Sequence, residues 1–266
     1  PVPVEYDAIL KTKYGDYMTP VHNWDTHEYP FYVKQKKHCI AEGIKSNDYK
    51  DTYKDYMKCK EQTDVIRKAK RIVKDFNGNT HKTVLFLSYK AENWNTMDNI
   101  YKKYCQEKDI KVIVQCVPYY YKNIDGTFEK YIDGGMYPEY VTITPIEDYN
   151  YVNENPDVIV FQNPYDNYNS AGTTDPVFYS YNLASHTQKL IYIPYFRTDE
   201  IDENDMRAYT NMDAYVTMPG VVYADKVIVQ SEEIRKLYIK KLTDFFGEES
   251  EAEWEDKIEA EDIGGI

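Results

Sequence analysis

Several short motifs that mark common enzymes are missing from this sequence. It has no G-x-G-x-x-G and no G-x-x-x-x-G-K loop, so neither dinucleotide binding nor P-loop phosphate binding is indicated. It also lacks a G-x-S-x-G elbow and an H-E-x-x-H pair, the signatures of serine hydrolases and zinc proteases. Basic residues are outnumbered, giving a net charge of −13. This balance argues against nucleic acid as the main partner, because neutralising phosphates requires clustered lysine and arginine.

Long apolar runs and clustered cysteines are also missing. No segment approaches the ~20 apolar residues of a membrane span. The four cysteines, at positions 39, 59, 105 and 116, form no C-x-x-C pair. Cysteines so widely spread are typical of reduced thiols in a cytosolic protein rather than of a disulfide framework. We therefore expect a cytoplasmic chain, and peripheral contact with the inner face of the cell membrane stays open.

Tyrosine, in contrast, is abundant, with 29 among the 266 residues. A tyrosine side chain offers a flat apolar ring with a hydroxyl at its end, which suits carbohydrate and nucleotide surfaces. The same excess arises from AT-rich coding sequence, so composition bias remains an alternative. The hydrophobic content of 42% is sufficient for a core. The length suits one sizeable domain with appendages.

The pattern along the chain predicts an irregular arm, a helical linker and one α/β domain. Residues 1–47 are rich in proline and aromatic side chains and show little periodicity. Residues 48–80 read as the linker, with a long helix near 48–76 and a stop at Asn77-Gly78. From 81 to 247, short β-branched runs alternate with helical stretches, which is typical of a Rossmann-like parallel sheet covered on both faces. The acidic segment 248–266 reads as a solvated terminal or interdomain segment.

The individual elements of the domain follow from the same reading. Strong strand candidates lie at 83–88, 111–117, 157–162, 189–193 and 226–230, and a weaker one lies at 140–144. Amphipathic helices are predicted near 93–107 and 232–246.

Polar and aromatic residues follow the predicted strands at the point where each strand ends. The run Val158 to Phe161, for example, stops abruptly at Gln162. In open parallel sheets, ligands gather outside the carboxyl ends of the strands, and the amino ends of these strands are plain by comparison. We therefore predict one binding cleft at this edge. Its candidate residues are Ser88, Tyr89, Lys90, Tyr119, Asn163, Tyr165, Asp166, Tyr195, Arg197 and Ser231.

Each candidate has an ordinary structural alternative. Asp166 is a weak candidate for a general base and equally a turn residue in a Pro-Tyr-Asp-Asn loop. Lys90 and Arg197 are the candidate phosphate partners, although a solvated cation is the commoner role for either one. Ser231 either binds a phosphate at a helix start or simply caps that helix. The tyrosines either stack on a ligand or fill space between loops and sheet.

Three blocks give the sequence a family resemblance: "NPYD" (163–166), "IPYF" (193–196) and "ADKVIVQSE" (224–232). Over about 82–258 the chain resembles the amino-terminal half of CDP-glycerol glycerophosphotransferases, which are GT-B-type enzymes of teichoic acid biosynthesis. The resemblance implies the acceptor-side lobe of a two-lobed fold, with CDP-glycerol bound as donor by a second lobe. It also implies transfer of glycerol phosphate, or a related polyol phosphate, to a cell-wall or capsular polymer. It places no metal or cofactor in this chain.

The first residues carry a second resemblance, centred on "YGDYM" (14–18). Residues 1 to about 40 resemble the carboxyl end of LicD-type phosphotransferases, which transfer phosphocholine onto cell-wall or capsular polymers. The two resemblances together indicate a fragment of a fused protein. Whether the native gene starts before Pro1 or continues beyond Ile266 stays open.

Two classes of function follow. In the first, the chain is the acceptor-binding part of a glycerophosphotransferase and does not transfer glycerol phosphate alone. In the second, it is a non-catalytic module that binds polyol phosphates or scaffolds LicD-type phosphocholine transfer. The parent gene separates them, because a second α/β domain after Ile266 favours the enzyme and a stop codon favours the module.

Overall fold

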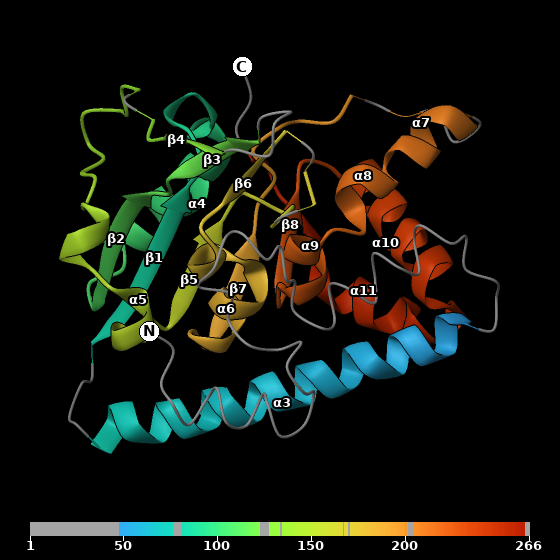
Figure 1. Ribbon diagram of the computed structural model, residues 1–266, viewed down its shortest axis with the longest axis horizontal. Helices are drawn as coiled ribbons and strands as arrows, with labels where there is room; N and C mark the ends of the chain where they lie inside the picture. Colours follow the sequence, from blue (N-terminus) through green and yellow to red (C-terminus); the bar gives the residue numbers. More distant parts are fainter. Residues whose placement is uncertain are drawn as a thin grey trace. The chain divides into compact units, whose positions relative to one another are not determined.

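Figure 1 shows the computed structural model of the chain. It describes residues 48–76, 81–122, 128–133, 135–166, 168–169, 171–199, 201 and 205–263. The predicted irregular arm, with the LicD-like segment, lies outside these residues, as does the Asn77-Gly78 stop. The chain divides into two units, Pro1–Gln62 and Thr63–Ile266. The second unit holds both sheets and the predicted binding edge.

A six-stranded parallel sheet forms the centre of the second unit (Figure 1). Its strands pair in the order β2-β1-β5-β7-β8-β9, and every pairing is parallel. The strands are β1 (Lys82–Ser88), β2 (Ile110–Cys116), β5 (Val158–Phe161), β7 (Lys189–Tyr192), β8 (Lys226–Val229) and β9 (Ile258–Ala260). Their β-branched and apolar runs are almost wholly buried, as expected for strands covered on both faces. The predicted α/β, Rossmann-like parallel sheet is confirmed.

The order of the strands reverses between β1 and β5. The chain goes from β1 outward to β2, then returns past β1 to β5 and continues through β7, β8 and β9. Such a reversal is a topological switch point, where neighbouring connections leave on opposite faces and a crevice opens at the carboxyl ends of the strands. This topology favours a ligand site beside the ends of β1 and β5.

Helices cover both faces of the sheet. On one face, Trp94, Met97, Ile100 and Tyr101 of α4 (Asn95–Cys105) and the turn before it pack with Phe86 and other strand residues. On the other, Leu183 of α6 (Ser180–Ser185) lies with Leu87 and Phe161, and α6 contacts α9 (Pro219–Tyr223). Ser231 caps α10 (Glu232–Phe246) by accepting a hydrogen bond from the backbone N–H of Ile234. The shorter helices are α5 (Tyr151–Glu154), α7 (Met206–Asn211) and α8 (Asp213–Val216).

A second, antiparallel sheet was not predicted. It pairs β4 (Phe128–Tyr131), β3 (Tyr119–Lys122) and β6 (Gly172–Thr174) in that order. The cluster at 119–122, predicted as a loop after a strand, is thus itself a strand. The weak strand candidate at 140–144 was wrong: Ile143 makes only an isolated bridge with Val114.

The long helix α3 (Asp48–Phe76) has the predicted bounds. In the second unit, its part from 63 to 76 lies at the amino-end edge of the main sheet. Arg67 is buried and forms a bidentate ion pair with Asp225, just before β8. Lys74 pairs with Asp157, just before β5, at 2.8 Å. These two pairs fix this end of α3 to the domain.

The acidic segment after Phe246 differs from the predicted solvated segment. It forms α11 (Glu251–Lys257) and then β9, which pairs with β8 at the edge of the sheet. Trp254 and Ile258 are both fully buried. The acidic side chains of α11 largely face solvent, while these apolar residues face the domain. The helix is therefore amphipathic, which the high acidic content of the segment did not indicate.

Candidate functional site

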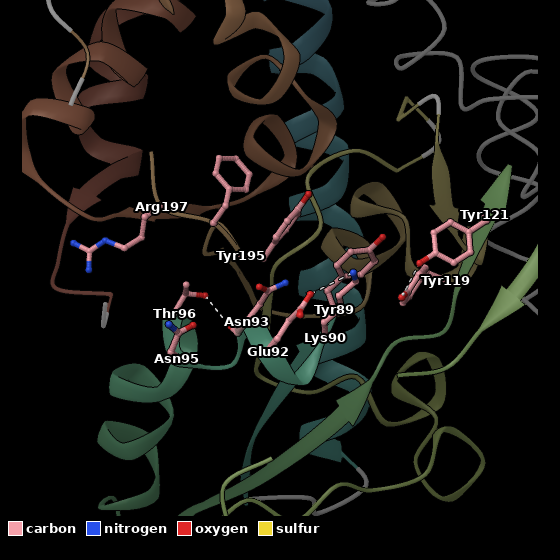
Figure 2. Close-up of a pocket in the computed structure, with 11 residues that line it drawn as sticks. Tyr89, Lys90, Glu92, Asn93, Asn95, Thr96, Tyr119, Tyr121, Tyr195 and Arg197 are labelled. Carbon is pink, nitrogen blue, oxygen red and sulfur yellow. Dashed lines mark hydrogen bonds and ion pairs between the residues drawn. The ribbon is translucent and has the colours of Figure 1, made fainter. Parts of the chain in front are cut away.

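A cleft of about 770 Å³ lies at the carboxyl-end edge of the main sheet, at the switch point beside β1. Its residues come from the segment after β1, the start of α4, strand β3 and the segment after β7 (Figure 2). They are Tyr89, Lys90, Glu92, Asn93, Asn95, Thr96, Tyr119, Tyr121, Tyr195, Phe196 and Arg197. The volume is in the range of clefts that hold a small organic ligand.

Aromatic rings form one wall of the cleft. The ring of Tyr89 lies 4.9 Å from that of Tyr119 and 5.5 Å from that of Tyr195. Tyr121 meets Tyr119 edge-on at 5.4 Å, and Phe196 meets Tyr195 edge-on at 5.1 Å. Burial, with smaller effects of Tyr195 and Tyr121, raises the pKa of the Tyr89 phenol to about 12. This hydroxyl therefore stays protonated at neutral pH and can donate a hydrogen bond to a ligand.

Two cations flank the aromatic wall. Lys90 Nζ lies 5.6 Å from the centroid of the Tyr119 ring and 3.4 Å from a carboxylate oxygen of Glu92. Arg197 is exposed at the other end of the cleft and forms no ion pair with any residue that the structure describes. In Figure 2 the start of α4 lies between the two cations.

The first residues of α4 line the cleft without a capping side chain. Trp94 precedes the helix in helical conformation and makes no side-chain cap. Asn93, Asn95 and Thr96 all border the cleft. The 3₁₀ turn Ala91–Asn93 leads directly into α4, and the N–H groups of Trp94 and Met97 donate to the carbonyls of Ala91 and Trp94. The N–H groups of Asn95 and Thr96 have no partner among the described residues, and such groups at a helix start favour an anion. The region between Lys90 and Arg197 therefore suits a phosphate better than a cation.

Gln162 explains why the buried strand β5 ends in an amide. Its side chain is fully buried; the oxygen accepts from the backbone N–H of Tyr89 at 3.1 Å. The amide nitrogen donates to the Asn93 carbonyl at 3.0 Å and to Thr96 Oγ1 at 2.9 Å. One side chain thus holds the segment after β1 against the start of α4, which are two sides of the cleft.

A second glutamine plays the same part at the end of β8. The side-chain oxygen of Gln230 accepts from the backbone N–H of Thr198 at 2.8 Å, and its nitrogen donates to the Thr198 carbonyl at 2.6 Å. These bonds hold the segment that carries Arg197. Strand-end glutamines therefore act as positioning residues rather than as ligand contacts.

Half of the predicted site residues line the cleft, and half do not. Tyr89, Lys90, Tyr119, Tyr195 and Arg197 line it. Ser88 is buried and accepts a hydrogen bond from Tyr137, and Ser231 caps α10. The Asn163 oxygen accepts from the backbone N–H of Tyr165, whose ring lies behind Tyr195 at 6.5 Å.

Asp166 is buried outside the cleft. Its Oδ1 accepts hydrogen bonds from the backbone N–H and the hydroxyl of Ser180, at the start of α6. Its backbone is left-handed, with φ of 50°. Burial raises the pKa of this carboxyl to about 7, against the opposing effect of the Ser180 hydrogen bonds. The geometry matches the turn alternative, since the Asp166 side chain is buried and does not line the cleft.

Sequence reasoning missed the other lining residues: Glu92, Asn93, Asn95, Thr96, Tyr121 and Phe196. Tyr121 and Phe196 lie in the polar and aromatic segments that follow two of the predicted strands. The sequence therefore contained a signal for both residues. Glu92 to Thr96 were overlooked because the start of a predicted helix does not reveal which edge of the sheet it faces.

Within the described ranges, no group of three or more histidine, cysteine or acidic side chains is arranged to hold a metal ion. No helix in those ranges is both long and apolar enough to cross a membrane. Comparison of the chain with protein-family models, with curated proteins and with solved structures found no match.

Proposed function

We propose that the cleft binds a polyol phosphate polymer. We further propose that the protein chain is the acceptor-side lobe of a CDP-glycerol glycerophosphotransferase-like protein. The observation that carries the proposal is the combination of a tyrosine wall with Lys90, Arg197 and an uncapped helix start in one cleft. Tyrosine rings and hydroxyls suit a polyol backbone. Cations and helix N–H groups suit its phosphates.

The proposed donor, CDP-glycerol, is bound elsewhere in the full-length protein. A nucleoside diphosphate needs its leaving diphosphate stabilised, a task that glycine loops, metal ions or clustered cations perform. This sequence contains no phosphate-binding glycine loop. The proposed reaction moves glycerol phosphate, or a related polyol phosphate, onto a cell-wall or capsular polymer at the cytoplasmic face of the membrane, once the donor lobe is present.

A second candidate is a non-catalytic module that binds the same ligand or scaffolds LicD-type phosphocholine transfer. The observation that favours it is the state of Glu92, the carboxylate that lines the cleft. Glu92 is ion-paired with Lys90 at 3.4 Å, so it is poorly placed to remove a proton from an acceptor hydroxyl.

Calorimetry on the purified chain tests the proposal. The ligands are a short poly(glycerol phosphate), glycerol and CDP-glycerol. We expect the poly(glycerol phosphate) to bind, and Lys90→Ala and Arg197→Ala each to weaken it by about tenfold or more, as for loss of one charge-assisted hydrogen bond. Lys111→Ala, at an exposed lysine near the amino end of β2, is the matched control.

Two results would contradict this function. Binding that is unchanged in both cleft variants would remove the cleft from the proposal. Micromolar affinity for CDP-glycerol would assign the lobe to the donor instead. Transfer that appears only after a second domain from the parent gene is added separates the enzyme from the module.

A further inference from the structure

The end of α3 carries an apolar stripe that faces away from the domain. Val65, Ile72 and Phe76 expose 66%, 69% and 90% of their surface, and Ala69 between them is also exposed. Exposed apolar residues scattered singly need no explanation, but a continuous stripe on one helix face marks a contact surface.

The opposite face of the same helix segment is fixed to the domain. Arg67 and Lys74 make the ion pairs with Asp225 and Asp157 at the amino-end edge of the sheet. At 3.6 residues per turn, Arg67 and Lys74 lie on the side of α3 opposite Val65, Ile72 and Phe76. The stripe therefore cannot turn inward to join the core without breaking both ion pairs.

The spacing of the stripe is that of a helix-pairing seam. Val65, Ala69, Ile72 and Phe76 follow one another at intervals of four, three and four residues, which is the a/d spacing of a coiled coil. Val73 broadens the stripe on one side and is 59% exposed. Layers that pair a large residue with a smaller one pack best in such a seam. The stripe offers both kinds, because Ala69 is small and Phe76 is large.

The charges beside the seam select a partner and a direction. Lys68 and Asp75 are exposed and lie on the same flank of the stripe, about two turns apart. In an antiparallel pair of identical helices, the layers become Val65 with Phe76 and Ala69 with Ile72 of the partner subunit. The same register brings Lys68 beside Asp75 of the partner subunit, twice, by symmetry.

We propose that the chain forms a dimer in which the end of α3 pairs antiparallel with α3 of a second copy. The proposal is independent of the function assigned to the cleft. An anionic membrane is a poorer partner, because the charged flank contains Asp64 and Asp75 as well as Lys68 and Arg71. These charges cancel, whereas surface-bound helices carry an excess of basic residues beside the apolar face.

Sedimentation equilibrium of the full chain tests the pairing and its direction. We expect Lys68→Glu and Asp75→Lys each to weaken the dimer by about tenfold, because attraction becomes repulsion at both symmetric contacts. The double variant restores the homodimer. An equimolar mixture of the two single variants forms a heterodimer, because each chain then offers the charges that the other needs.

Controls keep the test independent of folding. Ile72→Gln removes an exposed seam residue and should abolish the dimer with unchanged circular dichroism, whereas Met136→Gln, at a residue 96% exposed elsewhere, should leave it intact. A wild-type chain that stays monomeric up to about 0.1 mM overturns the proposal. So do charge variants without effect, and a monomer that binds vesicles containing phosphatidylglycerol through the stripe.

Discussion

The side-chain oxygen of Gln162 accepts a hydrogen bond from the backbone N–H of Tyr89, 3.1 Å away. This bond joins the end of β5 to the segment after β1, the two strands between which the sheet order reverses. Gln162 is therefore a structural residue, and Tyr89, which it holds, is at the centre of the aromatic wall. We therefore expect binding in the cleft to depend on a buried side chain that does not line it.

The Gln162→Leu variant should show whether Gln162 positions the cleft segments or only stabilises the fold. We expect it to lower the free energy of unfolding by roughly 2–4 kcal/mol, because buried polar groups of Tyr89, Asn93 and Thr96 lose their partner. Urea unfolding measures this change. Gln115→Leu is the matched control, since Gln115 is equally buried and donates to the Pro145 and Tyr149 carbonyls.

The two glutamine variants should differ in ligand binding. Poly(glycerol phosphate) affinity should fall in Gln162→Leu, at a temperature where both variants remain folded, and should stay near wild type in Gln115→Leu. Equal losses in both would show that Gln162 contributes only to stability.

Asp166→Asn should change how stability depends on pH. Burial raises the pKa of the Asp166 carboxyl to about 7 in the native state, against about 3.9 in an unfolded chain. The native state holds the proton more tightly, so the free energy of unfolding falls as pH rises from about 4 to about 7. Asparagine keeps an acceptor for Ser180 and tolerates the left-handed backbone.

Urea unfolding at several pH values checks this expectation. The variant should lose part of the decline in stability between about pH 4 and pH 7. Asp175→Asn, at the half-buried N-cap of the 3₁₀ turn Pro176–Phe178, is the control and should keep the wild-type profile. Superimposable profiles of wild type and Asp166→Asn would mean that this carboxyl titrates normally.

Trp254→Ala should show that the acidic end belongs to the fold. Trp254 is fully buried, its ring lies 5.0 Å from that of Phe246 in a tilted arrangement, and its indole N–H donates to Ser250. We expect a loss of about 3–5 kcal/mol, the usual cost of removing a buried large aromatic side chain. A solvated tail predicts no change, so thermal melts of Trp254→Ala beside Glu255→Ala, an exposed neighbour, discriminate the two.

Arg67→Met should loosen α3 from the domain. The variant leaves Asp225 with only the backbone N–H of Leu190 among its described partners. Breaking one side of a largely buried pair costs about 3–5 kcal/mol. Arg71→Met is the control on the same helix, because Arg71 is half exposed and its pair with Asp75 is weak. Hydrogen exchange should show faster exchange along 63–76 in the first variant and not in the second.

The main sheet and the long helix were predictable from sequence because their signals are local. Continuous β-branched runs specify buried parallel strands, and the stretch without glycine or proline specifies α3. The antiparallel sheet was missed because β3 pairs with β6, about fifty residues later in the chain, and neither strand has a strong pattern of its own. Strand β9 was missed because the many acidic residues around it favoured a solvated segment, although Trp254 and Ile258 are large and apolar.

The position of the cleft, but not its full lining, was predictable from the topology of the sheet. The rule that ligands gather at the carboxyl ends of parallel strands located the edge and five of its residues. It does not say which residues there point inward, so Asp166, which is turned into the core by its left-handed backbone, was included wrongly among the cleft residues. The start of α4 joins the cleft through the contacts of Gln162, and such contacts leave no trace in sequence spacing.

The parallel sheet keeps two kinds of residue apart. Asp157, which holds α3, and Gln162, which holds the cleft, stand at opposite ends of β5, a strand of four residues. At about 3.3 Å per residue, roughly 17 Å separates Asp157 from Gln162, which is beyond the range at which mutations usually interact. Changes at Lys74 or Arg67 and changes at Lys90 or Arg197 should therefore add without coupling. Mutations that change the cleft should therefore leave the edge that holds α3 unchanged.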